Sequence, residues 1–138
     1  MHLNVEKKLL LPAVPDSILR ATAFVDSLLE GIGCPPKAHS QLSVIIDEIF
    51  SNIVHHAKGA ETAEIRFTFT PETRTVRLTF ADRGIPYNPL RYETPDVTLP
   101  AEKRAIGGLG IFLVRKLADG ISYEYADGKN ILSIDKRI

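Results

Sequence analysis

The chain has 138 residues, of which 44% are hydrophobic, and this length and composition fit one domain, residues 1–138, with a sizeable core. Its 17 basic and 17 acidic residues balance without a run of like charge, which argues against nucleic acid as the main partner because binding to phosphates needs a concentrated basic surface. The single Cys34 excludes an internal disulfide, and no apolar stretch approaches the roughly 20 residues of a membrane-spanning helix, so we expect a cytoplasmic protein.

A strand and two helices are predicted for the first half of the chain. The strand covers residues 3–11 and ends before a proline. The first helix begins at residues 15–17, carries apolar residues at helical spacing and ends at residues 31–33, where two glycines lie. The second helix begins at residues 35–36, since proline is well tolerated in a first turn, and ends at residues 58–59.

A hairpin and a long loop are predicted next. Residues 64–70 and 76–80 alternate between apolar and polar side chains, as half-buried strands do, and the chain turns between them at residues 72–73. Residues 88–106 show no periodicity and contain three prolines. A loop of that length inside a compact domain is usually functional or disordered.

The last part of the chain is predicted to add a helix and a closing hairpin. The helix covers residues 108–118, and strands at residues 121–125 and 131–134 are joined by a turn at Asp127 and Gly128. Antiparallel hairpins dominate the element order, and helices occupy the rest of it. We therefore predict a two-layer α+β sandwich, in which about three helices cover one face of a mixed, mainly antiparallel sheet.

Three polar residues recur four positions apart on the second predicted helix, and therefore project from the same side of it: Glu48, Asn52 and His56. Asn52 and His56 fall against the apolar arc of the helix, and Glu48 falls at its rim. Burying an amide or imidazole costs on the order of a few kcal/mol without a partner, so such groups need a ligand, a metal, water or an internal network. The Asn52 amide oxygen suits Mg²⁺, and the Glu48 carboxylate one turn earlier can accept a proton.

Two other interpretations of this helix remain open at the level of the sequence. An ordinary amphipathic helix can also carry polar residues at the boundary of its apolar face. Zinc binding by His55 and His56 is disfavoured, because adjacent helical residues point about 100° apart and no cysteine or second histidine pair lies nearby.

A carboxylate and a glycine turn follow the second strand of the first hairpin. Asp82 is in phase with the inward-facing Phe80, so its side chain is expected to face inward at the end of the strand. The exocyclic amine of adenine is a suitable donor for such a carboxylate. Gly84 permits a close approach or a positive φ in the turn that follows, although an ordinary Asp-x-Gly turn has the same pattern.

A glycine-rich segment, Gly108, Leu109 and Gly110, opens the last predicted helix. Glycines leave backbone N–H groups uncovered at a helix N-terminus, where the helix dipole also favours anions such as the oxygens of a triphosphate. The segment lacks the lysine of a P-loop and the full glycine spacing of a dinucleotide-binding loop. Lys103 and Arg104, just before it, could close over phosphates or form a solvated charge pair.

These motifs, in this order, resemble those of bacterial anti-sigma regulatory factors with serine/threonine kinase activity, within the gyrase, Hsp90, histidine-kinase and MutL type of ATP-binding fold. Residues 47–57 match the N-box, residues 82–89 the adenine box and residues 107–116 the second glycine box, while residues 130–132 resemble the closing strand. The resemblance covers nearly the whole chain and implies a Bergerat-type fold.

The resemblance also implies a role for each matching residue. Glu48 would be the catalytic base, Asn52 the Mg²⁺ ligand and Asp82 the adenine ligand, with Gly84 beside it. The phosphates would lie on Gly108, Leu109 and Gly110 under a mobile lid. Ala105 and Ile106 stand where some relatives carry a lid arginine, and Arg104 lies slightly farther away.

By this resemblance the protein would use ATP and Mg²⁺ to phosphorylate a serine of an anti-anti-sigma (STAS) protein, and would sequester a sigma factor. Arg20 resembles a family position that contacts the partner, and a homodimer is allowed because relatives commonly dimerise. A non-enzymatic module that binds protein partners when ATP orders its lid is the alternative. The catalytic fragment of a histidine kinase ranks lower, because no dimerisation helix with a phospho-accepting histidine precedes the domain.

Overall fold

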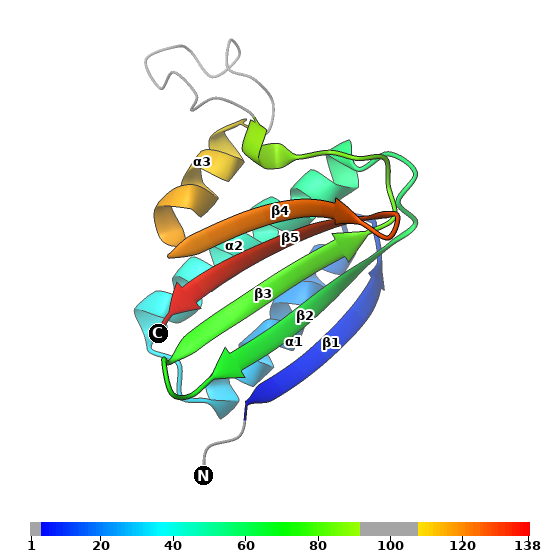
Figure 1. Ribbon diagram of the computed structural model, residues 1–138. Helices are drawn as coiled ribbons and strands as arrows, with labels where there is room; N and C mark the ends of the chain where they lie inside the picture. The colour runs from blue at the N-terminus through cyan, green and yellow to red at the C-terminus, as the bar shows by residue number, and fades with distance from the viewer. Residues whose placement is uncertain (1–3, 92–107) are drawn as a thin grey trace.

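The computed structural model describes residues 4–91 and 108–138, in which helices cover one face of a five-stranded sheet (Figure 1). The strands are β1 (Val5–Pro12), β2 (Thr62–Thr70), β3 (Thr75–Asp82), β4 (Gly120–Ala126) and β5 (Lys129–Arg137). The helices are α1 (Ser17–Gly31), α2 (Pro36–His56) and α3 (Gly108–Leu117), with a short 3₁₀ helix, η1 (Pro89–Arg91). The predicted two-layer α+β fold with three helices is confirmed.

The strand order in the sheet is β1-β2-β3-β5-β4, and each of these four pairings is antiparallel. Within the described residues the sheet therefore has no parallel pair, where a mixed sheet was expected. The closing hairpin joins the sheet through β5, which pairs with β3. The other strand of this hairpin, β4, forms the edge of the sheet. This register sets Asp82, the last residue of β3, directly opposite Asn130 near the start of β5.

The core lies between the sheet and the helices, and the alternating residues of the strands meet the apolar stripe of α2 there. Its largest fully buried side chains include Leu42, Ile45, Ile46, Ile49, Phe50, Ile65, Phe67, Leu78, Phe80 and Ile134. Burial of each such side chain contributes about 1.5–3 kcal/mol. Among the described helices none is long and apolar enough to cross a membrane.

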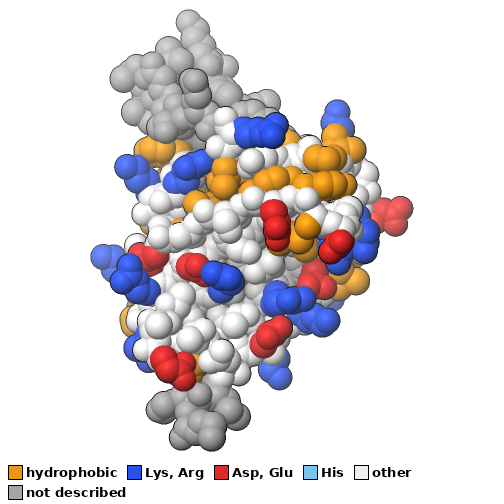
Figure 2. Space-filling view, in the orientation of Figure 1, with side chains coloured by type: hydrophobic (Ala, Val, Ile, Leu, Met, Phe, Trp, Pro, Cys, Tyr) orange, Lys and Arg blue, Asp and Glu red, His pale blue; other side chains and the backbone are white. Residues whose placement is uncertain are grey.

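The other face of the sheet carries no helix in the described part of the chain, and most of its side chains are polar, although the exposed Leu10 of β1 also lies on it. Figure 2 shows acidic and basic groups interspersed over this face. Arg77 donates two hydrogen bonds to the carboxylate of Asp135 on the neighbouring strand, at 2.7 and 3.0 Å. Thr79 and Ser133 share a further cross-strand hydrogen bond of 3.2 Å.

Candidate functional site

A pocket lies on the helix-covered side, where the last turns of α2 pass the ends of β3, β4 and β5. It is lined by Ile49, Asn52, Ile53, Ala57, Phe80, Asp82, Tyr87, Pro89, Tyr123, Asn130 and Leu132. Its walls are mainly apolar, with a small number of polar groups that converge on one end. This combination is typical of small-molecule sites, where apolar walls supply contact area and polar groups fix the orientation of a ligand.

Asp82 faces inward, as its phase on β3 predicted, and its side chain is only 5% exposed. Its Oδ1 accepts hydrogen bonds from the backbone N–H of Gly84, at 2.9 Å, and from Nδ2 of Asn130, at 3.0 Å. Both bonds use the same oxygen, and no hydrogen bond to Oδ2 is found among the described residues. The carboxylate is thus held by the protein through one oxygen while it lines the pocket.

Gly84 is buried where the turn after β3 passes the end of α2. A Cβ atom at this position would lie 2.7 Å from the carbonyl oxygen of Ala57, closer than side chains tolerate. The adjacent Ile85 donates its backbone N–H to the carbonyl of Lys58 at 2.8 Å. The sequence predicted either a close approach or a positive φ at Gly84. The structure shows the close approach, and the φ of Gly84 is not positive.

Asn52 reaches the pocket from α2, together with the apolar residues Ile49 and Ile53 that flank it on the helix. Its side chain is half-buried, which agrees with a position against the apolar arc. Asn52 and Asp82 therefore line the same pocket from opposite layers, the helix and the sheet. An amide oxygen at this place can accept a hydrogen bond or coordinate a hard cation.

His56 contacts the pocket through an aromatic neighbour. Its ring stacks on that of Tyr87, with centroids 4.9 Å apart and an interplanar angle of 6°. Burial, and next the neighbouring His55, lower the pKa of His56 below the usual histidine value. Within the described residues the aromatic ring of Tyr87 is thus the partner that the structure shows for the His56 side chain.

Glu48 lies one turn before Asn52 on α2 and meets the third helix. A Cβ atom built on Gly110 would lie 3.2 Å from Cδ of Glu48 and closer still to Oε2. Burial raises the pKa of Glu48, and the neighbouring Asp47 raises it further. Gly108 and Leu109 form the first turn of α3, just before Gly110. A carboxylate with a raised pKa, next to a helix N-terminus, can exchange a proton nearer neutral pH than an ordinary glutamic acid.

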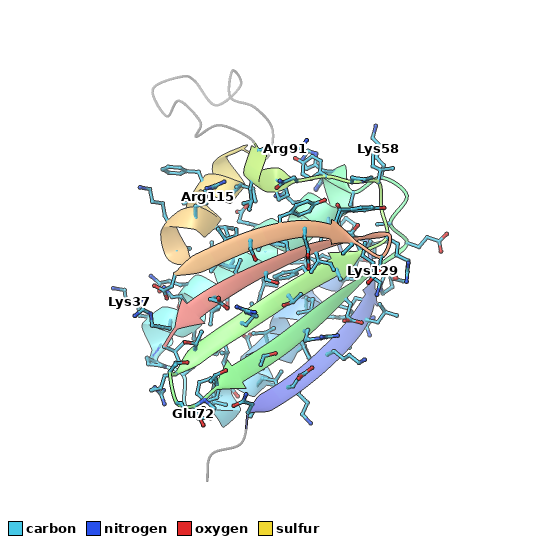
Figure 3. All side chains as sticks on the ribbon, viewed as in Figure 1. Lys37, Lys58, Glu72, Arg91, Arg115 and Lys129 are labelled. Atoms are coloured by element: carbon cyan, nitrogen blue, oxygen red, sulfur yellow. The ribbon has the colours of Figure 1, made fainter. Side chains whose placement is uncertain are left out.

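The last turn of the third helix is hydrogen-bonded to two other segments. Arg115 donates to the carbonyl of Leu90 in η1 at 2.9 Å, and Figure 3 shows it with Arg91 at this end of the molecule. Lys136 on β5 donates to the carbonyl of Leu117 at 2.6 Å, where a cation also matches the helix dipole. The C-terminal end of α3 is therefore anchored to η1 and to β5.

The remaining predicted residues are not part of this arrangement. Arg20 is exposed on α1, which lies behind the β1 side of the sheet, whereas α3 lies at the β4 side (Figure 1). Lys103 and Arg104 lie outside the described residues. The sites predicted on α2, β3 and α3 thus come together, and Arg20 is separate from them.

Asn130 is a pocket residue to which the sequence analysis assigned no role. Its Nδ2 donates to Oδ1 of Asp82 and to the carbonyls of Ile85, at 2.9 Å, and Gly84, at 3.4 Å. Its Oδ1 accepts from the N–H of Tyr87, at 2.9 Å, and from the hydroxyl of Tyr123. A signal was available, because Asn130 is in phase with the inward-facing Leu132 and Ile134.

Comparison with known proteins gives the family of the chain. The model of the histidine kinase-like ATPase domain matches residues 11–136, and the chain therefore belongs to this family. The fold agrees with a crystal structure of RsbU and RsbW domains from Mycobacterium tuberculosis, with a TM-score of 0.70. That match has 14% sequence identity and covers 96% of this chain and 32% of the other.

Two curated relatives are named as protein kinases. The serine/threonine-protein kinase BtrW of Bordetella bronchiseptica is 33% identical over 94 residues, which are 67% of this chain and 66% of that protein. The serine-protein kinase RsbW of Listeria monocytogenes is 28% identical over 130 residues, which are 88% of this chain and 81% of that protein. The predicted family resemblance is confirmed by these matches.

Proposed function

We propose that the protein is an ATP-dependent protein-serine kinase and anti-sigma factor, which phosphorylates a STAS-type anti-anti-sigma protein. One observation carries this proposal: Asn52 lines the pocket that contains Asp82, and Glu48, one helical turn earlier on α2, lies against Gly110 in the first turn of α3. The groups proposed for proton transfer, Mg²⁺, adenine and the phosphates are thus neighbours: Glu48, Asn52, Asp82 and the start of α3. The kinase names of the relatives support the same reaction.

The chemistry of the residues that line the pocket suits an adenine ring. Its apolar walls, including Ile49, Phe80 and Leu132, can pack against the two faces and edges of a flat base. The exocyclic amine of adenine would donate to the carboxylate of Asp82, with Gly84 beside it. The internal hydrogen bonds of Asp82 use Oδ1, which leaves Oδ2 for the ligand.

The phosphates would extend from the pocket towards the start of α3. The backbone N–H groups of Gly108, Leu109 and Gly110 are at the positive end of that helix, where anions bind favourably. Among the described residues no cluster of three acidic, histidine or cysteine side chains could hold a metal ion alone. The side-chain oxygen of Asn52 would serve as one ligand of Mg²⁺ beside phosphates and water, and the ion would neutralise phosphate charge.

Glu48 would act as the general base towards the serine hydroxyl of the partner. Phosphoryl transfer depends mainly on positioning and charge neutralisation, and a positioned base adds about 10²–10⁴-fold. The raised pKa of Glu48 improves its ability to take up the proton. Glu48 itself lies beside α3, so the attacking hydroxyl would approach between α2 and α3.

The remaining parts of the proposal concern partners and location. Exposed Arg20 would contact the sigma factor or the STAS protein, and Lys103 and Arg104 would belong to the lid over the phosphates. Sigma factors and their regulators act in the cytoplasm, which is the compartment proposed for this protein. A homodimer is included in the proposal on the basis of the family resemblance.

The test uses the purified chain, γ-labelled ATP and candidate STAS proteins from the same genome. We expect label on a serine of one of them, and loss of labelling in Glu48→Ala with ATP binding retained. Asn52→Ala should weaken binding of ATP in the presence of Mg²⁺ more than in its absence. ATP binding without any transfer would favour the non-enzymatic binding module, and absence of ATP binding by the wild type would contradict both functions.

A further inference from the structure

The side chain of Asn130 connects the segments that shape the polar end of the pocket. It is 5% exposed, and it contacts the end of β3, the turn that follows it, the start of the next loop and β4. Asp82, Tyr87 and Tyr123, three of its partners, line the pocket with it. A single amide therefore determines how several ligand-facing groups are arranged.

The amide of Asn130 has only one favourable orientation. Its NH₂ group faces acceptors, which are Asp82 Oδ1 and the carbonyls of the following turn, and its oxygen faces the donors of Tyr87 and Tyr123. A flipped amide would set its oxygen against the carboxylate of Asp82 and its NH₂ group against the backbone N–H of Tyr87. Leaving buried polar groups unpaired in this way costs about 1–3 kcal/mol for each group.

Tyr123 stabilises this orientation from the edge strand β4. The hydroxyl of Tyr123 donates its proton to Oδ1 of Asn130, and burial, the largest effect, raises the pKa of Tyr123, which further favours the protonated hydroxyl. The hydrogen-bonded chain therefore runs from Tyr123 through Asn130 to Asp82. Each member fixes the direction of the next.

We propose that Asn130 is a positioning residue that determines base selectivity, because it holds Asp82 by Oδ1 and leaves Oδ2 directed to the bound base. The proposal rests on the proposed nucleotide site. A fixed carboxylate accepts from the exocyclic amine of adenine but repels the carbonyl oxygen that guanine carries at the equivalent position. A carboxylate released from Asn130 can rotate and pair instead with the N–H donors of guanine, so the discrimination between the two bases would fall.

The test compares the binding of ATP and GTP, each with Mg²⁺, to the full chain by titration calorimetry. For Asn130→Ala we expect about tenfold weaker ATP binding with GTP binding unchanged or tighter, so that the ATP-to-GTP ratio falls at least tenfold. Tyr123→Phe removes one donor and little volume, and should lower the ratio by a smaller factor. It serves as the second variant if Asn130→Ala does not fold.

Ser133→Ala is the matched control, since Ser133 lies on the same strand but bonds to Thr79 on the opposite face of the sheet. The ratio of ATP to GTP binding of Ser133→Ala should equal that of the wild type. A wild-type ratio in both Asn130→Ala and Tyr123→Phe would overturn the proposal while ATP binding itself stands. A wild type that binds ATP without phosphorylating a protein would overturn only the kinase reaction, and one that binds neither nucleotide would overturn the site and this proposal together.

Discussion

The carboxylate of Glu48 on α2 lies against the α-carbon of Gly110 on α3, in the space that any larger residue at position 110 would fill. The two residues come from separate sequence motifs, and each was predicted to have its own role. The contact makes these roles interdependent, because the position of the proposed base requires the absence of a side chain on α3. Gly110 is therefore important for Glu48 as well as for the proposed phosphate site.

Gly110→Ala tests this contact. The atoms in the way are the end of a flexible side chain, so the fold can accommodate the methyl group while the Glu48 carboxylate moves. Alanine also favours a helix over glycine by about 1 kcal/mol, so the melting temperature should not fall. We expect kcat to drop about 100-fold, since a displacement of about 1 Å at a reacting group can cost that much, with the Kd for ATP changed much less.

The control for this substitution is Gly31→Ala, at the end of α1, where a Cβ atom would have no neighbour within 4 Å. It should leave both kcat and ATP binding at the wild-type level. Wild-type kcat in Gly110→Ala would show that the contact with Glu48 does not position the base.

Glu48→Gln should make the protein more stable near neutral pH. Burial raises the pKa of Glu48 above its unfolded value, so the native state takes up a proton more readily than the unfolded state. The stability linked to this group is present at acid pH and is lost as the pH rises through the folded pKa. Urea unfolding of the wild type and Glu48→Gln should show a difference in the free energy of unfolding at neutral pH, and this difference should disappear below the usual pKa of a glutamic acid. A difference that stays constant with pH would contradict this explanation.

Kinase activity should fall on acidification, because a protonated Glu48 cannot accept the proton of the serine hydroxyl. Since its pKa is raised, the fall should begin at a higher pH than for an ordinary glutamic acid. The measurement is the pH dependence of kcat/KM, which reports the groups of the free enzyme. The residual activity of Glu48→Gln should lack this acid limb, and an unchanged limb would assign it to another group.

Gly84→Ala should destabilise the protein by about 1–3 kcal/mol, because the atoms that a Cβ would meet belong to the backbone of Ala57 and cannot move aside cheaply. In a chain of this size each kcal/mol lowers the melting temperature by roughly 3–5 °C. Thermal unfolding followed by circular dichroism measures this shift. Gly31→Ala again serves as the comparison, and equal melting temperatures for the two variants would show that the turn after β3 can move away from α2.

His56→Ala should cost about 0.5–1.5 kcal/mol through loss of the ring stack on Tyr87, whereas His56→Phe should retain much of it. The pKa of His56 is lowered, so the unfolded state takes up its proton first as the pH falls. The associated stability is present at neutral pH and is lost as the pH falls through the folded pKa. The free energy of unfolding of His56→Phe should therefore depend less on pH than that of the wild type. A pKa of His56 in the usual histidine range, measured by NMR titration, would contradict this.

Much of the fold was predictable because its signals are local. The alternation of β2 and β3 and the apolar stripe of α2 follow from the periods of strand and helix, which short segments display. The inward direction of Asp82 followed from its phase with Phe80, and the burial of Asn52 from its place on the helix. The ends of α1 and α2 were marked by proline and glycine residues.

The sequence by itself determined the elements, their apolar faces and the order of three motifs, because each depends on residues that are near one another in the chain. Only the tertiary structure decided which of these motifs touch. The pairing of β3 with β5 sets Asp82 opposite Asn130, 48 residues away, and the packing of α3 on α2 brings Gly110 to Glu48. Strand order, register and helix docking arise from packing over the whole core, so no local pattern encodes them.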